Sequence, residues 1–344
     1  MYNPKIMLVT GGSGFIGSNY IEHVLECNPD LVVINYDLLT YAANVGFSEE
    51  IMQQYPERYK FIKGDICDES LLSEVFSNHS IDTVVHFAAE SHVDNSLTNP
   101  DVFLQTNIMG TNALLKVSLK FWKERYGLDV DRCRFHHIST DEVYGTLTLE
   151  QQDIFTEQSP YQPNSPYSAS KASSDHLVRC YFESFNLPIT MTNTSNNFGP
   201  RQHGEKFIPT IIRSCFNKEA IPVYGEGKNI RDWIFVKDHC EMIHKVIQHG
   251  QVGESYNIGG DNEVANIDLC RTISELMNKL DDDSFDYQQL ITFVKDRAGH
   301  DLRYAINMDK YRQNIGGAKH TPFGQALRTT INYNLSLLNK DALT

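Results

Sequence analysis

Two short segments carry residue types that could do acid–base and redox chemistry together. Thr140, Asp141 and Glu142 stand side by side in the first segment. Tyr167 and Lys171 follow in the second, with three residues between them. A free phenol has a pKa of about 10 and is a poor base unless a nearby cation favours its phenolate. Because residues four apart share one face of a helix, Lys171 could supply that cation. Tyr167 could then take a proton from a substrate hydroxyl while a hydride leaves the same carbon.

The two acids could add a second reaction to the first. Oxidation of a sugar hydroxyl to a ketone acidifies the neighbouring C–H, so one carboxylate could remove that proton. A carboxylic acid could then help the next hydroxyl leave as water, and adjacent carboxyls in different environments can divide into acid and base. Taken alone, an Asp-Glu dipeptide is most often a pair of exposed loop acids. A Tyr-x-x-x-Lys spacing alone is most often a chance pair on a helix surface. The catalytic interpretation of the Asp-Glu dipeptide and of the Tyr/Lys pair therefore depends on the elements around them.

A glycine-rich turn near the N-terminus indicates a dinucleotide site. Gly11, Gly14 and Gly17 follow a short apolar run and open a helix-like segment. Such a turn lets the backbone approach a pyrophosphate, and the helix N-terminus offers free N–H groups to it. Asp37 ends the next strand candidate, where a carboxylate could bind the adenosine ribose hydroxyls and would repel a 2′-phosphate. A turn without a ligand would explain the glycines alone, but the agreement of strand, turn, helix and Asp37 favours NAD.

Strand and helix candidates alternate through the first half of the chain. The strand candidates are 6–9, 31–36, 61–62, 83–87 and 133–138, and the helical segments include 15–27 and 70–76. This alternation predicts an α/β fold, a Rossmann-type doubly wound parallel sheet with helices on both faces. Ligands of such sheets bind outside the carboxyl ends of the strands. Thr140, Asp141 and Glu142 follow a strand candidate and are therefore expected beside the nicotinamide.

The second half of the chain has a looser pattern. Pro200, Pro209 and Pro222 interrupt it. We predict an NAD-binding Rossmann domain over residues 1–195 and a smaller, loop-rich α/β substrate-binding lobe over residues 196–344. Segments near 230–260 are expected to return to the first domain. The acidic run at 281–283 is expected to be a solvated loop.

Composition excludes several classes of function. The formal net charge of -14 argues against nucleic-acid binding, which needs a basic face. We expect no membrane span, since no apolar stretch approaches about 18 residues. The N-terminus lacks the regions of a signal peptide, so we expect a cytoplasmic protein. The seven cysteines are scattered, which favours structural free thiols. His, Cys and Asp lack metal-ligand spacing, so no metal is expected.

Six stretches resemble the extended short-chain dehydrogenase/reductase family over nearly the whole chain. They are 9–19, 86–94, 139–145, 166–172, 195–197 and 296–301. Within the family, the adjacent acids after Thr140 are similar to those of the dTDP-glucose 4,6-dehydratase group, whereas sugar epimerases usually lack both. The resemblance implies a tightly bound NAD that is regenerated in each turnover, a nucleoside-diphosphate glucose substrate and a homodimer.

The resemblance also implies a role for each candidate catalytic residue. Tyr167, with Thr140 on the same oxygen, removes the C4 hydroxyl proton while NAD takes the C4 hydride. Glu142 removes the C5 proton, and Asp141 protonates the departing C6 hydroxyl. The hydride then returns to C6, which yields a 4-keto-6-deoxy sugar nucleotide. Lys171 completes the catalytic set.

Ligand contacts follow from the same resemblance, position by position. The residues expected to bind NAD are Gly11, Gly14, Phe15, Ile16, Gly17, Asp37, Asp65, Ile66, Ala88, Ala89, Thr106, Tyr167, Lys171 and Asn197. The residues expected to bind the sugar nucleotide are Ser91, Thr140, Asn196, Lys206, Phe207, Pro222, Tyr224, Arg231, Asn266 and His300. The planar guanidinium of Arg231 suits diphosphate oxygens, and an ion pair with Asp232 or Asp238 is the alternative.

Three other functions are compatible with these residues. A UDP-glucose 4,6-dehydratase would share the Thr-Asp-Glu feature. A 4-epimerase or decarboxylase of the same fold would share the glycine turn and the Tyr/Lys pair, and a non-catalytic NAD-binding protein would share the turn alone. The helical pattern at 102–120, with Phe103, Leu114, Leu115 and Leu119, fits either a dimer helix or a helix that faces the core.

Overall fold

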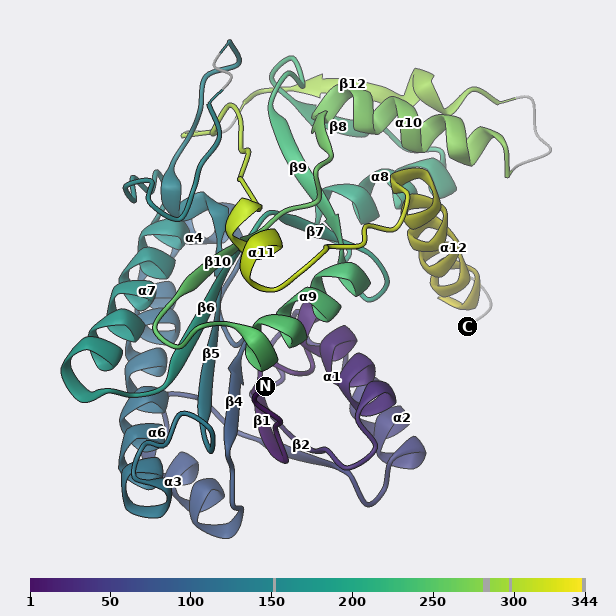
Figure 1. Ribbon diagram of the computed structural model, residues 1–344. Coiled ribbons are helices and arrows are strands. Elements are labelled where there is room, and N and C mark those ends of the chain that lie inside the picture. Colours follow the sequence, from purple (N-terminus) through teal and green to yellow (C-terminus); the bar gives the residue numbers. More distant parts are fainter. Residues whose placement is uncertain (151–152, 281–284, 297–298, 342–344) are drawn as a thin grey trace.

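The protein is described by a computed structural model over residues 1–150, 153–280, 285–296 and 299–341 (Figure 1). The acidic run at 281–283, predicted to be a solvated loop, lies outside the described residues. The chain forms one large parallel sheet with helices on both faces, and a smaller lobe lies beyond one end of its strands (Figure 1). The predicted Rossmann-type α/β fold is therefore confirmed.

Seven parallel strands form the central sheet in the order β10-β6-β5-β4-β1-β2-β3. They are β1 (Ile6–Thr10), β2 (Val32–Asp37), β3 (Tyr59–Lys63), β4 (Thr83–His86), β5 (Arg134–Thr140), β6 (Ile189–Thr194) and β10 (Ser255–Ile258). Strand β1 pairs with both β2 and β4. Strands β2 and β3 extend the sheet on one side of β1, and the later strands β4, β5, β6 and β10 extend it on the other. This topology opens a crevice at the carboxyl ends of β1 and β4, where ligands of doubly wound sheets bind.

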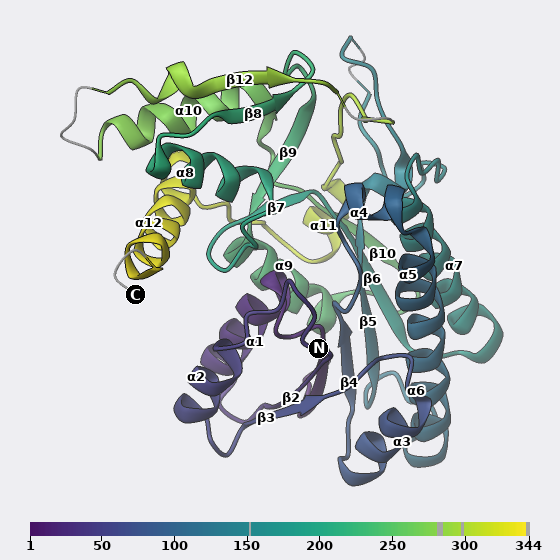
Figure 2. The ribbon, with the colours of Figure 1, turned by 180° about the vertical axis from the view of Figure 1, so that it is seen from behind.

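Helices cover both faces of the sheet (Figures 1 and 2). Helices α1 (Phe15–Cys27), α2 (Phe47–Gln54) and α9 (Val236–His249) lie on one face, and α3 (Glu69–Asn78), α6 (Thr111–Tyr126) and α7 (Pro166–Phe185) lie on the other. Each face has its own apolar core. Tyr20, Ile21 and Ile243 are buried in the first core, and Leu114 and Trp122 in the second. Burial of this apolar surface holds the helices, and the residues at their ends, in fixed positions relative to the strands.

The segment predicted as one helix over 102–120 consists of several turns of different pitch. After α4 (Val93–Thr98) come α5 (Pro100–Phe103), the π-helical turn η1 (Leu104–Gly110) and then α6. Phe103, Leu114 and Leu115 are buried, and Leu119 packs against the second core. The apolar pattern therefore belongs to a core-facing surface. π-Helical turns occur often at functional sites, and η1 carries Thr106 and Asn107 to the crevice.

The smaller lobe contains two short sheets and several helices. One sheet has the order β11-β9-β7, and β12 pairs with β8 in the other. The strands are β7 (Asn196–Phe198), β8 (Ile221–Tyr224), β9 (Ile230–Phe235), β11 (Glu263–Ala265) and β12 (Ile291–Val294). The helices are α8 (Phe207–Asn217), α10 (Asn266–Asn278) and α12 (Phe323–Asp341), with the short 3₁₀ turn η3 (Tyr287–Leu290). Helix α11 (Asp309–Asn314) packs instead on the first core beside β10, and the 3₁₀ turn η2 (Asp141–Tyr144) follows β5. A third apolar core, which includes Ile211 and Ile273, holds the lobe together.

Residues after 190 contain more regular structure than the loop-rich lobe that we predicted. The prolines that suggested loops occupy positions that helices and edge strands tolerate. Pro209 lies in the first turn of α8, and Pro222 is exposed in β8, which pairs with a single neighbour in the described structure. Within the segment 230–260, α9 packs on the first core and β10 pairs with β6 in the main sheet.

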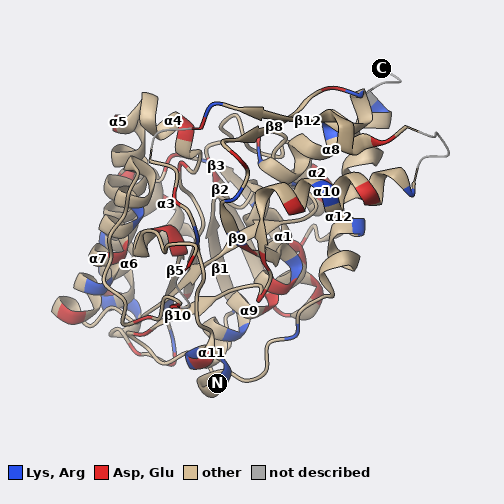
Figure 3. Ribbon diagram, turned by 90° about the horizontal axis from the view of Figure 1, so that it is seen from above, with Lys and Arg blue, Asp and Glu red and all other residues tan. Residues whose placement is uncertain are grey.

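Several other features bear on the expected classes of function. Among the described residues, no helix is long and apolar enough to span a membrane, and no group of His, Cys, Asp and Glu could hold a metal ion. All seven cysteines are free thiols. Acidic and basic residues are interspersed along the helices on both sides of the sheet (Figure 3).

Candidate active site

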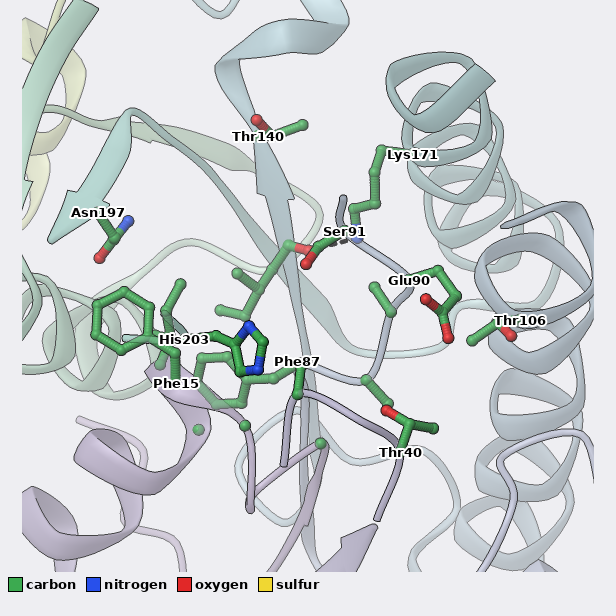
Figure 4. A pocket seen from close by; sticks show the side chains of 18 of the residues that line it. Phe15, Thr40, Phe87, Glu90, Ser91, Thr106, Thr140, Lys171, Asn197 and His203 are labelled. Carbon is green, nitrogen blue, oxygen red and sulfur yellow. Dashed lines mark hydrogen bonds between the residues drawn. The ribbon is translucent and has the colours of Figure 1, made fainter. Parts of the chain in front are cut away.

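Two adjoining cavities lie at the carboxyl ends of the strands. The first has a volume of about 340 Å³ and the second about 280 Å³. Figure 4 shows the first, with Phe15 at the start of α1, Thr140 at the end of β5 and Lys171 on α7 around one space. The residues that line both cavities are Ser91, Glu142, Asn196, Asn197, Gln202, Glu205 and Lys206. A reaction between a group in one cavity and a group in the other would take place at this boundary.

The glycine turn forms one wall of the first cavity. Gly11 has a φ of +69°, and a Cβ at this position would lie 2.6 Å from the backbone nitrogen of Ala88. A Cβ on Gly17 would lie 2.3 Å from the carbonyl oxygen of Gly11, so these two positions admit glycine alone. No side chain caps the N-terminus of α1, whose first N–H groups are left for a ligand. The turn therefore fits the pyrophosphate of a dinucleotide.

Asp37 stands at the end of β2, beside the same cavity. Its carboxylate accepts hydrogen bonds from the backbone N–H groups of Ser13 (2.9 Å) and Leu39 (2.7 Å). Burial raises the pKa of Asp37, and these two hydrogen bonds oppose that rise. The carboxylate of Asp37 thus stabilises the glycine turn through Ser13, and Asp37 also lines the cavity. A negative group at this point fits ribose hydroxyls better than a 2′-phosphate.

All the residues predicted to bind NAD line the first cavity. They are Gly11, Gly14, Phe15, Ile16, Gly17, Asp37, Asp65, Ile66, Ala88, Ala89, Thr106, Tyr167, Lys171 and Asn197. Asn197 is fixed by His239 of α9, whose Nδ1 lies 2.8 Å from its Oδ1. Burial lowers the pKa of His239 to about 3, so this histidine is neutral near pH 7. Residues that are far apart in the sequence therefore meet around one cavity.

Helix α7 brings Tyr167 and Lys171 to the cavity beside Thr140. Ser165 and Ser168 form a capping box at its start, and Pro166 occupies the first turn. Tyr167 lies in that first turn, where the helix dipole favours negative charge. Its phenol hydrogen-bonds with the side chain of Thr140. The end of β5 and the start of α7 thus converge on one phenolic oxygen.

The environment of Tyr167 and Lys171 disfavours the phenolate of Tyr167 unless a further positive charge lies nearby. Burial and the charge of Glu142 raise the pKa of Tyr167, while its hydrogen bond with Thr140 opposes the rise. Burial lowers the pKa of Lys171 to about 8. The ammonium donates a 2.7 Å hydrogen bond to the carbonyl oxygen of Ile138. A positively charged nicotinamide nearby would favour the Tyr167 phenolate further.

The two acids after β5 occupy different environments. Asp141 is 1% exposed, and its Oδ2 has no hydrogen-bond partner among the described residues. Burial and the neighbouring charge of Glu142 raise the pKa of Asp141 well above its ordinary value. Glu142 is half-buried and lines both cavities. Asp141 is therefore suited to hold a proton and Glu142 to face a substrate.

Arg231 of β9 faces the second cavity. Its guanidinium donates to the carbonyl oxygens of Ile230 (2.8 Å) and Asp301 (2.8 Å), and its Cζ lies 4.3 Å from the ring centroid of Tyr304. The carboxylate of Asp232 instead accepts from the backbone N–H groups of Gly260 and Asn262, and that of Asp238 accepts from Thr321. Arg231 is therefore oriented toward the cavity by backbone carbonyls and an aromatic face.

The other residues predicted to bind the sugar nucleotide divide between the cavities. Ser91, Asn196, Lys206, Phe207, Pro222, Tyr224, Asn266 and His300 line the second cavity with Arg231, and Thr140 lines the first. The Lys206 ammonium donates to the carbonyl oxygen of Ser91 at 3.1 Å. Nδ1 of His300 lies 2.6 Å from the Asp296 carboxylate, and the His300 ring packs edge-on against Tyr224.

Sequence reasoning missed several lining residues. Thr40, Glu90, His203 and Glu205 line the first cavity, and Trp233 and Tyr304 are among those that line the second. A period of two along β9 places Trp233 on the same face as Arg231, and this signal could have identified it. The position of Tyr304 depends on the fold of the smaller lobe, and no local pattern marks it.

Comparison with known proteins identifies the family. The family model described as GDP-mannose 4,6 dehydratase matches residues 8–330. The chain belongs to this family. Among the relatives, a dTDP-glucose 4,6-dehydratase of Neisseria meningitidis is 47% identical, over 96% of this chain and 93% of the relative. The enzyme of the same name from Haemophilus influenzae is 46% identical, over 96% of this chain and 97% of the relative.

Solved structures of the dehydratase family have the same fold. The crystal structure of a dTDP-glucose 4,6-dehydratase from Streptomyces venezuelae with NAD bound has a TM-score of 0.85 at 37% identity, and the match covers 96% of this chain and 97% of that chain. The enzyme of the same name from Bacillus anthracis, in complex with NAD, has a TM-score of 0.82 at 37% identity, with 96% of each chain covered. A UDP-glucose 4-epimerase from Thermotoga maritima has a TM-score of 0.84 at 23% identity, which shows the shared fold alone.

Proposed function

We propose that the protein is an NAD-dependent sugar-nucleotide 4,6-dehydratase that converts dTDP-glucose to dTDP-4-keto-6-deoxyglucose and water. The observation that carries this proposal is the convergence of Thr140, Asp141 and Glu142 with Tyr167 and Lys171 around the first cavity, with Glu142 at its boundary with the second. A simple dehydrogenase needs the phenol and the ammonium alone. A buried acid and a half-buried carboxylate beside them supply the proton transfers that loss of water requires.

The residues of the first cavity fit NAD. The turn at Gly11 and Gly17 admits no side chain, and the uncapped start of α1 faces the same space. Asp37 would hold the adenosine ribose, and Lys171 the nicotinamide ribose. When bound, NAD would accept a hydride from C4 of the sugar and return it to C6, so that no cofactor is consumed. Relatives crystallised with NAD support this assignment.

The chain's own groups would move the protons. Tyr167, with Thr140 on the same oxygen, takes the proton of the C4 hydroxyl, and the Lys171 ammonium stabilises the phenolate. The C4 ketone acidifies C5–H, and Glu142 removes that proton. Asp141, held neutral by burial, donates its proton to the C6 oxygen, which leaves as water. The proton on Glu142 can then return to C5. Tyr167 now carries one proton more, and Asp141 one fewer, than at the start, so release of the proton from Tyr167 and uptake of one by Asp141 through solvent restore the starting state.

The second cavity would hold the nucleoside diphosphate. Arg231 presents a guanidinium whose plane is already fixed by two carbonyl oxygens, which suits bidentate contact with phosphate oxygens. Lys206 reaches the boundary of the cavities, and Tyr224 and Pro222 lie on β8 beyond it. We assign the sugar to the boundary and the base to the β8 end. The relatives at 46–47% identity support dTDP as the nucleotide.

Incubation of the purified protein with dTDP-glucose, and separately with UDP-glucose, tests the proposal by mass spectrometry. We expect loss of the mass of one water from the dTDP sugar, without net accumulation of NADH. Loss of water from UDP-glucose alone would assign the other base. An unchanged mass with inversion at C4 would overturn the dehydratase in favour of the 4-epimerase, and UDP-galactose would be the next substrate to test.

We further propose that the NAD-binding domain spans residues 1–195 with the returning segment 230–260.

We also propose that the protein is a homodimer. Leu97, Val102, Leu104 and Met109 are exposed apolar residues between α4 and η1 and supply a candidate contact surface. Analytical ultracentrifugation of the protein and of a Leu104→Lys/Met109→Lys variant tests the dimer. A dimer that persists in the variant would place the contact elsewhere, and a monomeric parent protein would contradict it.

A further inference from the structure

A buried carboxylate lies next to the proposed catalytic pair, and the reaction outlined above leaves it without a role. Asp175 is on α7, four residues after Lys171 and eight after Tyr167, so the three side chains share one helix face. It is 2% exposed. Burial of an ionised carboxylate is costly unless hydrogen bonds and a counter-charge compensate for it. Asp175 lines neither cavity, so any effect on the reaction must pass through its neighbours.

Three donors hold the Asp175 carboxylate. Ser139 Oγ donates to Oδ2 at 2.6 Å and the Tyr161 hydroxyl donates to the same oxygen at 3.0 Å. Nε2 of His137 lies 3.1 Å from Oδ1. His137 and Ser139 lie two residues apart on β5 and therefore project from the same face of the strand. The carboxylate thus ties α7, which carries the phenol and the ammonium, to β5, which ends in the Thr-Asp-Glu segment.

These contacts keep the carboxylate ionised. Burial opposes ionisation of Asp175, but the hydrogen bond with His137, the charge of Lys171 and the hydrogen bond with Ser139 together lower its pKa. Burial also lowers the pKa of His137 to about 4, so near pH 7 a neutral imidazole donates its Nε2–H to Asp175. A negative charge therefore persists within the protein interior beside α7.

Lys171 is the group that responds to this charge. Burial lowers the pKa of Lys171, and the negative charge of Asp175 opposes that fall. Besides His137 on β5, the described titratable groups near Asp175 include Tyr144, Tyr161 and Tyr167; burial raises the pKa of all three phenols, and the charge of Asp175 adds to the rise. Near pH 7 these neighbours are neutral. Asp175 and Lys171 are therefore two opposite charges on the same face of α7, although the Lys171 ammonium hydrogen-bonds to Ile138 and not to the carboxylate.

We propose that Asp175 is a positioning residue for the dehydratase reaction: its carboxylate fixes α7 against β5 and keeps Lys171 in its ammonium form beside Tyr167. The inference rests on the proposed function for its kinetic part. Without the charge of Asp175, Lys171 would lose its proton at a lower pH, and the phenolate of Tyr167 would lose its stabilising cation. The charge of Asp175 also raises the pKa of Tyr167, so its loss would act on the phenol directly in the opposite sense. Without the hydrogen bonds, the phenol would no longer be held against Thr140.

An Asp175→Asn variant tests the charge directly. Titration of carbon-13-labelled lysine by NMR, on protein with NAD and no sugar nucleotide, follows Lys171, whose signal is the one absent from Lys171→Met. Removal of a negative charge destabilises the ammonium, so we expect the pKa of Lys171 to fall by about 1 unit from its value in the parent protein. The alkaline limb of the kcat profile should move to lower pH by the same amount.

Two further variants separate the charge from the contacts. Tyr161→Phe removes one hydrogen bond to Asp175 and keeps the carboxylate, so the titration of Lys171 should stay close to that of the parent. Asp175→Glu keeps the charge at a displaced position, so it should restore most of the pKa of Lys171 while kcat remains reduced. This variant keeps the test decisive if Asp175→Asn does not fold, because a pKa of Lys171 lowered by a full unit in Asp175→Glu would overturn the proposal.

The outcomes distinguish this inference from the proposed function. An Asp175→Asn protein with normal melting temperature and NAD content, an unchanged Lys171 titration and an equal loss of activity at every pH would assign Asp175 a purely structural role. The NMR titration requires no turnover. A parent protein that fails to dehydrate dTDP-glucose would therefore contradict the function and leave the titration to decide the inference.

Discussion

The two cavities of this protein are neighbours but are built in different ways. The first is made largely from strand ends and from the glycine turn, where backbone atoms decide what fits. The second is made from side chains of β8, β9, α8 and α10 and of the segment around His300. Backbone geometry is specified by a few consecutive residues, whereas a wall of side chains depends on how distant elements pack. Substitutions in the first cavity should therefore abolish cofactor binding, whereas substitutions in the second should weaken substrate binding in part.

The largest effect is expected at the glycine turn. Gly11→Ala places a methyl group 2.6 Å from the backbone nitrogen of Ala88, and the φ of +69° disfavours any side chain. We expect loss of bound NAD and of all measurable activity, as determined by the NAD content of the purified protein. Gly46→Ala is the matched control, because a Cβ there meets no atom within 4 Å. Full NAD content in Gly11→Ala would refute a backbone-defined cofactor site.

The next effect lies at the boundary of the cavities. Glu142→Gln should reduce dehydration by about 10³-fold, since an amide cannot remove the C5 proton, while NAD content stays that of the parent. Mass spectrometry of the sugar nucleotide and absorbance of the bound cofactor provide the two measurements. Dehydration at the parent rate would show that Glu142 is not the base. A loss of NAD instead would place Glu142 in the cofactor wall rather than at the boundary.

Tyr167→Phe should lower kcat by at least about 10²-fold, because the phenolic oxygen that accepts the C4 proton is removed. The aromatic ring and its contact with Phe103 remain, so the protein should keep its fold and its NAD. Stopped-flow measurement of cofactor reduction isolates this step. Tyr311→Phe, which removes a buried phenol outside the two cavities, is the control for loss of a hydroxyl. Equal rates of cofactor reduction in the parent and in Tyr167→Phe would assign the base elsewhere.

The smallest effect is expected within the second cavity. Arg231→Lys removes the planar fork that the carbonyl oxygens of Ile230 and Asp301 hold in place. Loss of charge-assisted hydrogen bonds to a diphosphate should raise KM by about 10- to 100-fold, with kcat changed little. Arg271→Lys, in an exposed ion pair with Asp268 on α10, is the matched control. A large fall in kcat at constant KM would mean that Arg231 acts on the reacting sugar instead of the diphosphate.

Much of the first cavity could be predicted from the sequence because its chemistry is local. The spacing of Gly11, Gly14 and Gly17 indicates a turn and a helix start, and the four-residue spacing of Tyr167 and Lys171 indicates one helix face. Parallel strands end at the same edge of a sheet, so Thr140 could be placed near both from its position after a strand. The structure places these residues around one cavity.

Other features required the packed chain. We interpreted Pro209 and Pro222 as signs of loops, but Pro209 lies in the first turn of a helix and Pro222 in an edge strand. Proline interrupts the apolar pattern of the sequence in the same way in a loop, a helix start and an edge strand. The contact between Arg231 and Tyr304 joins residues far apart in the sequence. So does the hydrogen bond between Ser139 and Asp175, which no spacing rule marks.

The sequence by itself determined the fold class and the dinucleotide turn, and it supplied the candidate acid–base residues, because each follows from backbone conformation or from neighbours within one helical turn. Tertiary structure alone decided the environment of those residues. Burial and the charge of Glu142 raise the pKa of Asp141, and burial lowers the pKa of Lys171 while the charge of Asp175 opposes that fall. Burial and the distance between charges set both properties, and they exist once the strands and helices are packed.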